Sequence, residues 1–346
     1  MSNHNHPTPE NILKTGMAFW PSKILLTAVK LDLFSLLAEK KQLSGAEIKS
    51  ALGFNCTARH CYDFLDTLTT IGFLNRDGLL ESAKYSNADD TDFFLDKKKP
   101  SYVGGLLIMA NNRLYPFWND LEEGLKTGEA QNEVKHGKGN LFEELYASPE
   151  RLKEFIHAMS GVQMGNFMAF AQKFDFSNKK TLADIGGSGA MLSLMVVKHQ
   201  PHMSCISFDL PPVAAVAQEN INHFGLAEKV KTASGDFFAE DLPKADVLVM
   251  GNILHDWNEA NKLILMKKAY AALPDGGALV VIENIIDDDR SKNAFGMMMS
   301  LNMLIETAHG FDFTFADFNG WAKECGFSKT EILPLAGPSS AVIAYK

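Results

Sequence analysis

The chain has 346 residues, of which 46% are hydrophobic, and its 33 basic and 42 acidic side chains give a formal charge of −9. This length allows two or three domains with sizeable cores, which excludes disordered and fibrous proteins. An acidic chain also lacks the extended positive surface that binds nucleic acids and anionic membranes, so a small molecule or another protein is the expected partner.

No targeting or membrane segment is evident in the sequence. The amino-terminal residues lack the basic and apolar regions of a secretory signal, and no run of about 18 apolar residues predicts a membrane span. The four cysteines are too few and too scattered for a disulfide framework, and no second Cys/His pair accompanies them at zinc-ligand spacing. We therefore predict a cytoplasmic protein without a metal.

Amphipathic helices are predicted in the first part of the chain. Apolar residues recur at helical spacing over residues 11–37, which indicates two or three helices. Ser44, with Glu47 three positions later, forms a capping-box pattern that opens a short helix, and Thr57 opens a longer one.

A hairpin signal follows these helices. Asp77-Gly78 lies between two short strand-like runs within residues 72–80 and has the chemistry of a type I′ turn. Helices followed by a β-hairpin predict a winged-helix module over residues 1–100.

The charge of this module decides between two uses of a winged helix. Its 12 basic and 12 acidic residues cancel. The candidate recognition helix presents Arg59 and His60 but also Asp63 and Asp66, which would repel phosphates. We therefore expect the apolar surface of the first helices to pack on a partner subunit, and we expect no nucleic acid or membrane partner.

Residues 101–175 are predicted to form a helical linker and substrate-lid region. Apolar residues recur at helical spacing here, and Pro116 marks a kink or a break. A polar interval over 124–140 predicts a loop, and residues 141–174 resume the helical pattern with many Met and Phe residues. Such a stripe usually lies in a core, although it also suits the wall of an apolar cavity.

From residue 180 strands alternate with helices, which predicts a doubly wound parallel sheet in an α/β domain over residues 176–346. The predicted strands are Thr181–Ile185, Cys205–Asp209, Val230–Ser234, Ala245–Met250 and Ala278–Glu283. A Gly337-Pro338 turn between two apolar runs predicts a final antiparallel strand pair at the sheet edge.

A glycine-rich loop follows the first predicted strand, with Asp184 before it and Gly186, Gly187 and Gly189 within it. Glycines let the backbone approach a ligand closely, and Asp184 is placed to accept hydrogen bonds from a ligand or from the loop's own amides. The loop has neither the GxGxxG spacing of dinucleotide sites nor the GxxxxGK[ST] of phosphate loops, which argues against a dehydrogenase or a kinase.

The next two strands end in groups suited to adenosine. Asp209 and Leu210 follow the second strand, where a carboxylate is placed to bind ribose hydroxyls. Gly235, Asp236 and Phe237 follow the third strand and combine a polar side chain with aromatic rings, which suits adenine. The sequence therefore indicates an adenosine cofactor without a phosphate.

His255 lies just beyond the fourth strand, where open α/β sheets bind ligands. Histidine titrates near neutrality and is the commonest general base. Glu283 ends the fifth strand 28 residues later, and a carboxylate on the far imidazole nitrogen would fix the tautomer and raise the basicity. A structural role for His255 is the alternative on this pattern alone.

These motifs, in this order, resemble class I S-adenosylmethionine-dependent O-methyltransferases of the plant caffeate, acetylserotonin and bacterial antibiotic-tailoring type. The resemblance covers almost the whole chain and is carried by the winged-helix region, DIGGSGA, FDLPPV, SGDFF, LPKADVLVM, NILHDW, ALPDGG and AKECGF. It implies a Rossmann-like methyltransferase domain preceded by a mostly helical winged-helix dimerisation domain. It also implies a homodimer that transfers a methyl group from S-adenosyl-L-methionine to a hydroxyl of a small, aromatic acceptor.

The resemblance assigns roles to individual residues. His255 matches the base that deprotonates the acceptor, Glu283 the carboxylate that orients it, and Asp312 a second helper acid. The implied cofactor-binding residues are Asp184, Gly186, Gly187, Gly189, Asp209, Leu210, Gly235, Asp236, Phe237 and Asn252. The implied substrate-binding residues are Phe155, Met159, Met298, Met299, Asn302 and Met303.

Three departures from the family pattern bear on these assignments. The glycine loop is interpreted as one residue shorter than the usual DxGGGxG. Asp312-Phe313-Thr314 stands where many relatives have Glu-Arg-Thr, so the second helper acid is shorter by one methylene. Gly251-Asn252 replaces the Lys-Trp pair of the plant enzymes, which leaves the edge of the cofactor site more open.

Alternatives of two kinds remain open from the sequence. The same scaffold serves nitrogen and sulfur acceptors, and a few cofactor-binding relatives perform other chemistry. A protein of another class, a non-catalytic winged-helix regulator that senses a ligand, would bind DNA with a steep salt dependence.

Overall fold

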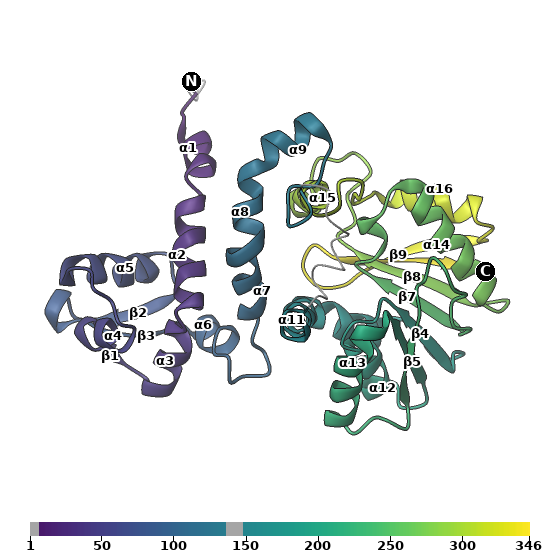
Figure 1. The fold of residues 1–346 in the computed structure, drawn as a ribbon, viewed down its shortest axis with the longest axis horizontal. Coiled ribbons are helices and arrows are strands. Elements are labelled where there is room, and N and C mark those ends of the chain that lie inside the picture. Colours follow the sequence, from purple (N-terminus) through teal and green to yellow (C-terminus); the bar gives the residue numbers. More distant parts are fainter. Residues whose placement is uncertain (1–6, 136–147) are drawn as a thin grey trace, which may run out of the picture. The chain divides into compact units, whose positions relative to one another are not determined.

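This computed structural model describes residues 7–135 and 148–346. The chain divides into two compact units, Met1–Tyr115 and Pro116–Lys346 (Figure 1). The segment predicted over 101–175 is thereby shared between the two units. Parts of the predicted loop over 124–140 and of the predicted helical stretch over 141–174 lie outside the described residues.

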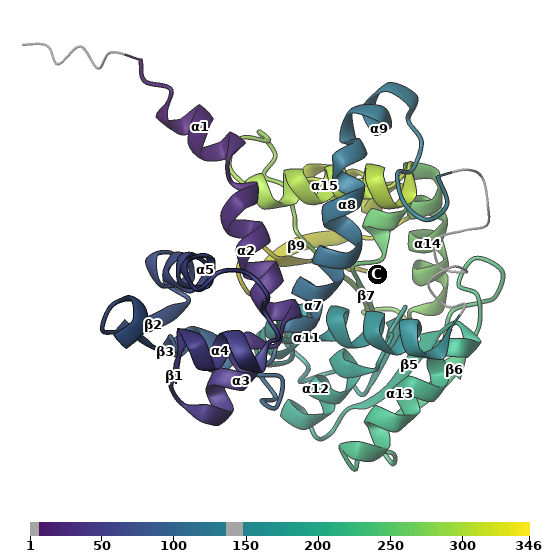
Figure 2. The same ribbon diagram turned by 60° about the vertical axis from the view of Figure 1, so that its left-hand side comes forward.

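Three helices open the first unit, as the periodicity over residues 11–37 predicts. They are α1 (Glu10–Gly16), α2 (Phe19–Lys30) and α3 (Leu33–Lys40). Helices α2 and α3 bury one face each, through residues such as Val29 and Phe34, whereas α1 buries no residue. Figure 2 shows α1 extending beyond the body that the other elements of this unit form.

The predicted capping box is present at the next helix. Ser44 ends β1 (Leu43–Ser44) and caps α4 (Gly45–Ala51): its Oγ accepts a hydrogen bond from the Glu47 N–H at 3.3 Å, and the Glu47 carboxylate accepts one from the Ser44 N–H at 2.7 Å. Thr57 caps α5 (Ala58–Thr70) with its side chain alone, which accepts a hydrogen bond from the His60 N–H.

The predicted type I′ hairpin is wrong, although a hairpin is present. Strand β2 (Leu74–Asp77) pairs with β3 (Lys84–Asn87), and a 3₁₀ turn at Leu80–Ser82 lies in the connection between them. Asp77 belongs to the strand, and only Gly78 of the expected turn pair has a positive φ, at 83°. Fully buried Tyr85 sets the pairing opposite Arg76, so the second strand begins later than turn chemistry suggests.

Strands β1, β3 and β2 form a three-stranded antiparallel sheet in that order, which with α3, α4 and α5 completes the predicted winged helix (Figure 2). Short helices follow it and lead through the boundary between the two units. They are α6 (Asp89–Phe94), α7 (Gly104–Met109), α8 (Tyr115–Phe117) and α9 (Leu121–Thr127). Pro116 lies between a π-helical turn at Ala110–Leu114 and a 3₁₀ turn at Trp118–Asp120. The helix is irregular here because proline cannot donate the hydrogen bond of a regular α-helix.

The second unit is built on a seven-stranded sheet with the order β6-β5-β4-β7-β8-β10-β9. The first five of these strands run parallel, as predicted, and β10 and β9 form the predicted antiparallel pair, with β10 beside β8. Their bounds are β4 (Thr181–Ile185), β5 (Ser204–Asp209), β6 (Val230–Ser234), β7 (Val247–Gly251), β8 (Ala278–Glu283), β9 (Lys329–Pro334) and β10 (Ser340–Tyr345).

Helices cover both faces of this sheet (Figure 1). One face packs on α11 (Pro149–Lys173), α12 (Met191–His199) and α13 (Pro211–His223). The other face packs on α14 (Glu259–Ala272) and α16 (Phe315–Glu324), and α15 (Ala294–Thr307) precedes α16. The central strands β4, β7 and β8 are near-continuous apolar runs because both of their faces are buried. This arrangement leaves the carboxyl ends of β4 to β8 as the edge at which polar groups collect.

Within the described ranges, no helix combines the length and the apolar character needed to cross a membrane.

Candidate active site

The loop after β4 turns sharply by using left-handed backbone. Gly186, Ser188 and Ala190 have φ values of 69°, 50° and 61°. Position by position, Asp184 to Ala190 therefore has the full length of the DxGGGxG pattern, with Ser188 and Ala190 where the pattern has glycine. The interpretation of a shortened loop is wrong: the departure is two substitutions, each of which places a Cβ in a conformation that favours glycine.

Replacing Ser188 with glycine is expected to stabilise the protein. The change removes the steric cost of left-handed backbone at a non-glycine residue, and we expect the free energy of unfolding to rise by about 1 kcal/mol. Chemical denaturation of the wild-type and Ser188→Gly chains measures this difference. A Ser177→Gly variant, in an exposed loop where φ is not positive, is the control and should not gain stability. A loss of stability in Ser188→Gly would contradict the strain argument.

Two of the loop glycines are also required by packing within the chain. A Cβ on Gly187 would lie 2.3 Å from the Ser207 Oγ, and one on Gly189 would lie 2.8 Å from the Asn220 Nδ2. Both distances are far below van der Waals contact. Part of the glycine signal in this motif therefore reflects close approach of β4, β5 and α13 rather than a ligand.

Asp209, at the end of β5, accepts a backbone hydrogen bond at each of its two carboxylate oxygens. One carboxylate oxygen accepts from the Ser188 N–H at 2.8 Å and the other from the Leu210 N–H at 2.7 Å. Asp209, not Asp184, therefore accepts from the amides of the glycine loop. Asp184 is buried and takes a long hydrogen bond, 3.4 Å, from the Ser193 hydroxyl.

Burial raises the pKa of both of these carboxyl groups. The pKa of Asp184 rises to about 7, with Asp209 as the second cause, and that of Asp209 rises to about 6 although two N–H donors oppose the shift. Each oxygen of Asp209 keeps one lone pair after its backbone hydrogen bond. The pair of acids therefore favours a ligand that brings hydroxyl donors or positive charge.

The end of β6 combines an exposed acid with an aromatic cluster. Asp236 follows Gly235 and its carboxylate accepts from the Phe238 N–H at 2.8 Å. The rings of Phe237 and Phe238 lie edge to face, with centroids 4.9 Å apart, and Phe238 packs on Trp257 at 4.7 Å. An aromatic surface next to a carboxylate is suited to a flat heterocycle with an amino group.

His255 lies on a 3₁₀ turn (Leu254–Asp256) just after β7 and is 4% exposed. Its Nδ1 is 3.4 Å from the Glu283 carboxylate and 3.5 Å from that of Asp312, and its Nε2 is 3.6 Å from that of Asp256. The structure thus brings together all three predicted catalytic residues and adds Asp256. Glu283 also accepts a hydrogen bond from the His255 backbone N–H at 3.3 Å.

The charges of this cluster determine its titration. Burial lowers the pKa of His255, but Glu283, Asp256 and Asp312 outweigh that effect and raise it to about 10. Burial raises the pKa of Glu283 to about 8 and that of Asp256 to about 6. Because these groups interact strongly, their protons belong to the cluster as a whole. The cluster holds a proton near the His255 imidazole at neutral pH.

Lys262, a residue that the sequence analysis missed, joins the two segments that carry this cluster. Its side chain is fully buried, and its Nζ donates to the Trp257 carbonyl at 2.5 Å and to the Phe311 carbonyl at 3.0 Å. The ammonium also lies 3.4 Å from the centre of the Phe311 ring. Burial lowers its pKa to about 8, against the pull of the nearby carboxylates. The signal was present in helix periodicity, since Lys262 shares a face with buried Leu265 and Met266.

Asn252, also at the end of β7, has left-handed backbone with a φ of 54°, and its side-chain oxygen accepts from the amide of Gln163 at 2.9 Å. Buried Gln163 was not predicted as a site residue. Gln163 and Asn166 are two buried amides one turn apart on α11, and this spacing is the signal that sequence reasoning could have used.

The predicted substrate residues lie on α11 and α15 and differ in exposure. Met303 is buried, Phe155, Met159, Met299 and Asn302 are half-buried, and Met298 is 52% exposed. Asn302 accepts a hydrogen bond from the Trp118 indole at 2.8 Å, which adds an aromatic residue that the prediction lacked. Ser300 on the same helix accepts from the Asp312 N–H at 3.2 Å, so α15 also positions the helper acid.

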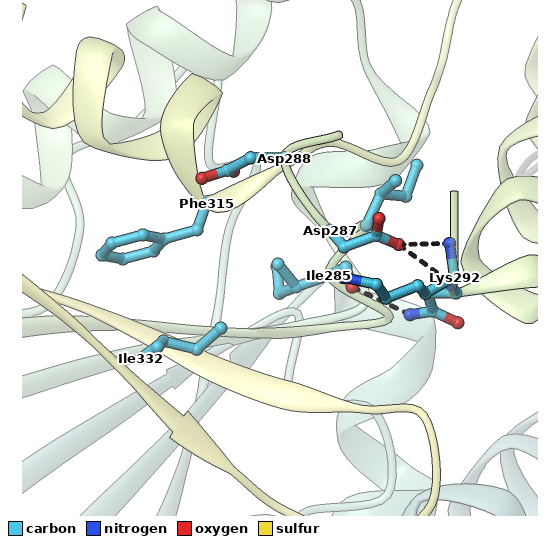
Figure 3. Close-up of a pocket in the computed structure, with 8 residues that line it drawn as sticks. Ile285, Asp287, Asp288, Lys292, Phe315 and Ile332 are labelled. Atoms are coloured by element: carbon cyan, nitrogen blue, oxygen red, sulfur yellow. Dashed lines mark hydrogen bonds between the residues drawn. The ribbon is translucent and has the colours of Figure 1, made fainter. Parts of the chain in front are cut away.

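A cavity of about 390 Å³ lies elsewhere in this unit, between the loop after β8 and the start of α16 (Figure 3). Ile285, Phe315 and Ile332 form its apolar wall. The Asp287 carboxylate turns to the backbone N–H groups of residues 291–293, which it caps. None of its lining residues is a predicted site residue.

Comparison with known proteins agrees with this geometry. Residues 118–328 match the model of the O-methyltransferase domain, and residues 13–97 match that of the O-methyltransferase dimerisation domain. The chain is 36% identical to the tetracenomycin polyketide synthesis 8-O-methyl transferase of Streptomyces glaucescens, with 100% of this chain and 99% of the relative covered. It is 30% identical to the 3-hydroxy-5-methyl-1-naphthoate 3-O-methyltransferase of Streptomyces sahachiroi, with 96% and 93% covered.

A solved structure shows the same fold. Human N-acetylserotonin methyltransferase in complex with SAM superimposes with a TM-score of 0.90 at 25% identity, over 100% of this chain and 99% of that one. The winged helix, the doubly wound sheet and the family matches therefore agree along the whole chain. The chain belongs to the O-methyltransferase family and is an S-adenosylmethionine-dependent O-methyltransferase.

Proposed function

We propose that the protein methylates a hydroxyl of a small aromatic acceptor, with His255 as the general base. The observation that carries the proposal is the buried cluster in which Glu283 and Asp312 face the Nδ1 of His255. Support for an aromatic acceptor comes from the Met- and Phe-rich walls on α11 and α15 and from the naphthoate and polyketide relatives. Such walls accommodate flat rings without selecting a single one.

The cofactor is proposed to bind along the carboxyl ends of β6, β5, β4 and β7. Asp236 and Phe237 are placed for adenine, Asp209 for the ribose hydroxyls, and Gly186, Gly187 and Asn252 for the remainder of the molecule. Buried Asp184 and half-buried Asp209, whose raised pKa values a nearby cation would lower, fit a positively charged ligand. When bound, S-adenosylmethionine supplies an electrophilic methyl group on its sulfonium.

The chain's own residues then align the acceptor and remove its proton. Glu283 and Asp312 hold the Nδ1 side of the imidazole, which leaves Nε2 to accept the proton of the acceptor hydroxyl. Asp256 lies on the Nε2 side and stabilises the imidazolium once it forms. The 4% exposure of His255 keeps bulk water from this proton transfer.

A panel of acceptors tests this function. Purified full-length protein is incubated with methyl-labelled S-adenosylmethionine and naphthol, hydroxynaphthoate, hydroxyquinone and indole acceptors, and the products are read by mass. Transfer to a phenolic hydroxyl is the expected result. Matched arylamines and thiophenols extend the panel, and transfer to these alone would overturn the proposed hydroxyl acceptor.

The chain is proposed to act as a homodimer through its first helices. Five large apolar residues of α1 and α2 and their junction are exposed within the first unit: Ile12, Leu13, Met17, Phe19 and Trp20. Together with the match to a dimerisation domain, this patch supports a second copy as the partner. DNA is a poorer partner for this unit, because Arg59 is already paired with Asp63 at 3.0 Å.

Polar substitutions in this apolar patch are expected to separate the subunits. A Phe19→Ser/Trp20→Ser variant should shift the wild-type dimer to a monomer at micromolar concentration, because two large aromatic residues are removed from the interface. Light scattering coupled to size exclusion measures the mass. Phe93→Ser, at a residue 55% exposed elsewhere in the same unit, is the control and should stay dimeric. A monomeric wild-type chain would contradict the proposal.

Methyl transfer is proposed to need no metal, although one donor atom each of His255, Glu283 and Asp312 lie within 4.8 Å of one another. In the proposed mechanism these atoms share a proton instead. Dialysis against a chelator should therefore leave turnover unchanged. Loss of turnover on chelation, restored by a divalent metal, would show that the centre is a metal site.

A further inference from the structure

A relay of side-chain amides connects the turn between β9 and β10 to Asn252 at the proposed cofactor site. The Ala336 N–H donates to the Asn166 side-chain oxygen at 3.2 Å, the Asn166 amide donates to the Gln163 oxygen at 2.8 Å, and the Gln163 amide donates to the Asn252 oxygen at 2.9 Å. Gln163 and Asn166 are 7% and 5% exposed. Water therefore cannot readily replace these hydrogen bonds.

The direction of this relay is set at one end by a backbone group. The oxygen and nitrogen of an Asn or Gln amide are told apart only by their partners, but a backbone N–H is always a donor. Asn166 must therefore turn its oxygen to Ala336, which leaves its amino group for Gln163. Gln163 then turns its amino group to Asn252. The result is that Asn252 uses its oxygen inside the relay and keeps its amino group for a group outside it.

The place of Asn252 on the sheet edge identifies what that group is. Along the strand order, Asp236 follows β6, Asp209 follows β5, the glycine loop follows β4, and Asn252 follows β7. Adenine is proposed at Asp236 and ribose at Asp209. The amino-acid part of S-adenosylmethionine then lies at the glycine loop and Asn252. The ends of β4 and β7 do meet, since a Cβ on Gly186 would lie 2.3 Å from the Ile253 side chain. The acceptor-only group in this part of the cofactor is its carboxylate.

We propose that Gln163 and Asn166 are positioning residues that hold Asn252 with its amino group toward the carboxylate of S-adenosylmethionine. The inference rests on the proposed placement of the cofactor. Neither Gln163 nor Asn166 needs to touch the ligand: the buried relay excludes the rotated state in which Asn252 would present its oxygen. Such a state would place two acceptors against each other and lose a hydrogen bond to a charged group.

A single substitution far from the ligand reverses the relay. In Asn166→Asp one carboxylate oxygen still accepts from Ala336, but the other can only accept. Gln163 must then turn its amino group to residue 166 and its oxygen to Asn252, and Asn252 must rotate and present its oxygen to the ligand. A double variant, Asn166→Asp with Gln163→Met, controls for the added negative charge. It keeps the charge at residue 166 but breaks the relay between that residue and Asn252.

Calorimetric titration of the full-length chain with two ligands measures the effect without turnover. S-adenosylmethionine and its decarboxylated form differ only in the carboxylate. The wild-type chain should bind the first about tenfold or more tightly than the second, as expected for a hydrogen bond to a charged group. In Asn166→Asp this ratio should fall to about one, and in the double variant it should recover. Gln172→Glu, the same kind of change at an exposed position of α11, should leave the ratio unchanged.

Each contrary result is distinct. A wild-type chain that does not bind S-adenosylmethionine overturns the proposed cofactor site together with the relay. Tight binding without preference for the carboxylate overturns the relay alone, as does a ratio that stays low in the double variant, which would assign the effect to charge. If Asn166→Asp loses its circular dichroism spectrum, Gln163→Glu reverses the last link and Asn252→Ala removes the amino group. Both should lower the ratio in the same way, and unchanged ratios in both overturn the proposal.

Discussion

A His255→Ala variant is expected to bind S-adenosylmethionine as the wild type does and to lose about 10²- to 10⁴-fold in turnover on a phenolic acceptor, the usual contribution of a general base. Proton removal must accompany attack because a phenol remains protonated at neutral pH. Calorimetry measures cofactor binding, and a mass-based assay measures turnover. His223→Ala, at an exposed position on α13, is the control and should retain full activity. Unchanged turnover in His255→Ala at pH 7 would exclude the base.

The pH dependence of the same reaction follows from the raised pKa of His255. A pKa of about 10 means that the folded protein retains the imidazole proton up to alkaline pH, so the unprotonated base is scarce at pH 7. As the pH rises from 7 toward this pKa, the unprotonated fraction of His255 increases about tenfold per pH unit. We expect kcat/KM for a phenol to rise between pH 7 and 9. In the His255→Ala variant, the part of this rise that comes from deprotonation of His255 should be absent. Acceptors whose hydroxyl ionises below pH 7 need no base, so for them the penalty of the substitution should shrink.

Replacing Lys262 with methionine is expected to destabilise the second unit by about 3 kcal/mol, because two buried carbonyl groups lose a charged donor and the neighbouring carboxylates lose a compensating cation. For a unit of this size the loss corresponds to a fall in Tm of roughly 6 to 12 °C. Turnover measured well below the Tm should also fall, since the ammonium ties the segment of His255 to that of Asp312 through Trp257 and Phe311.

The same helix provides a matched control for this experiment. Lys267 on α14 is 54% exposed and pairs with Glu324 at 3.0 Å, so Lys267→Met should leave both the Tm and turnover unchanged. Differential scanning calorimetry of the two variants beside the wild type separates a buried structural cation from a surface one. Equal Tm values for Lys262→Met and the wild type would show that the ammonium contributes no net stability.

Local sequence signals predicted the elements of this fold well where one interaction determines the structure. Ser44 and Glu47 are three residues apart and cap a helix as expected, and the apolar runs of β4, β7 and β8 are strands because both faces of the sheet are buried there. The turn at Asp77-Gly78 failed for the opposite reason. Its chemistry involves two residues, but burial of Leu74 and Tyr85 on the flanking strands sets the strand pairing.

Some residues of the candidate site could likewise be predicted from local signals and the order of elements, whereas others depend on tertiary packing. The proximity of His255 and Glu283 could be predicted because strand ends meet at one edge of a parallel sheet, a rule that needs only the order of elements. The amide relay could not be found in this way. It depends on α11 passing a turn that is 170 residues later in the chain, at Ala336, and on the burial of Gln163 and Asn166 by the folded unit. Lys262 was missed because a lysine on a helix is usually solvated, and only its place among apolar neighbours indicates otherwise.

The position of β10 sets the order in which the second unit is completed during synthesis. This strand follows every other element of the unit in the chain, yet it lies inside the sheet, hydrogen-bonded to β8 on one side and β9 on the other. Until residues 340–345 have left the ribosome, β8 and β9 each expose an unpaired edge of the kind that promotes aggregation. The sheet of the second unit is therefore complete only once its last strand in the chain has inserted between two others, which makes this insertion a late step of folding.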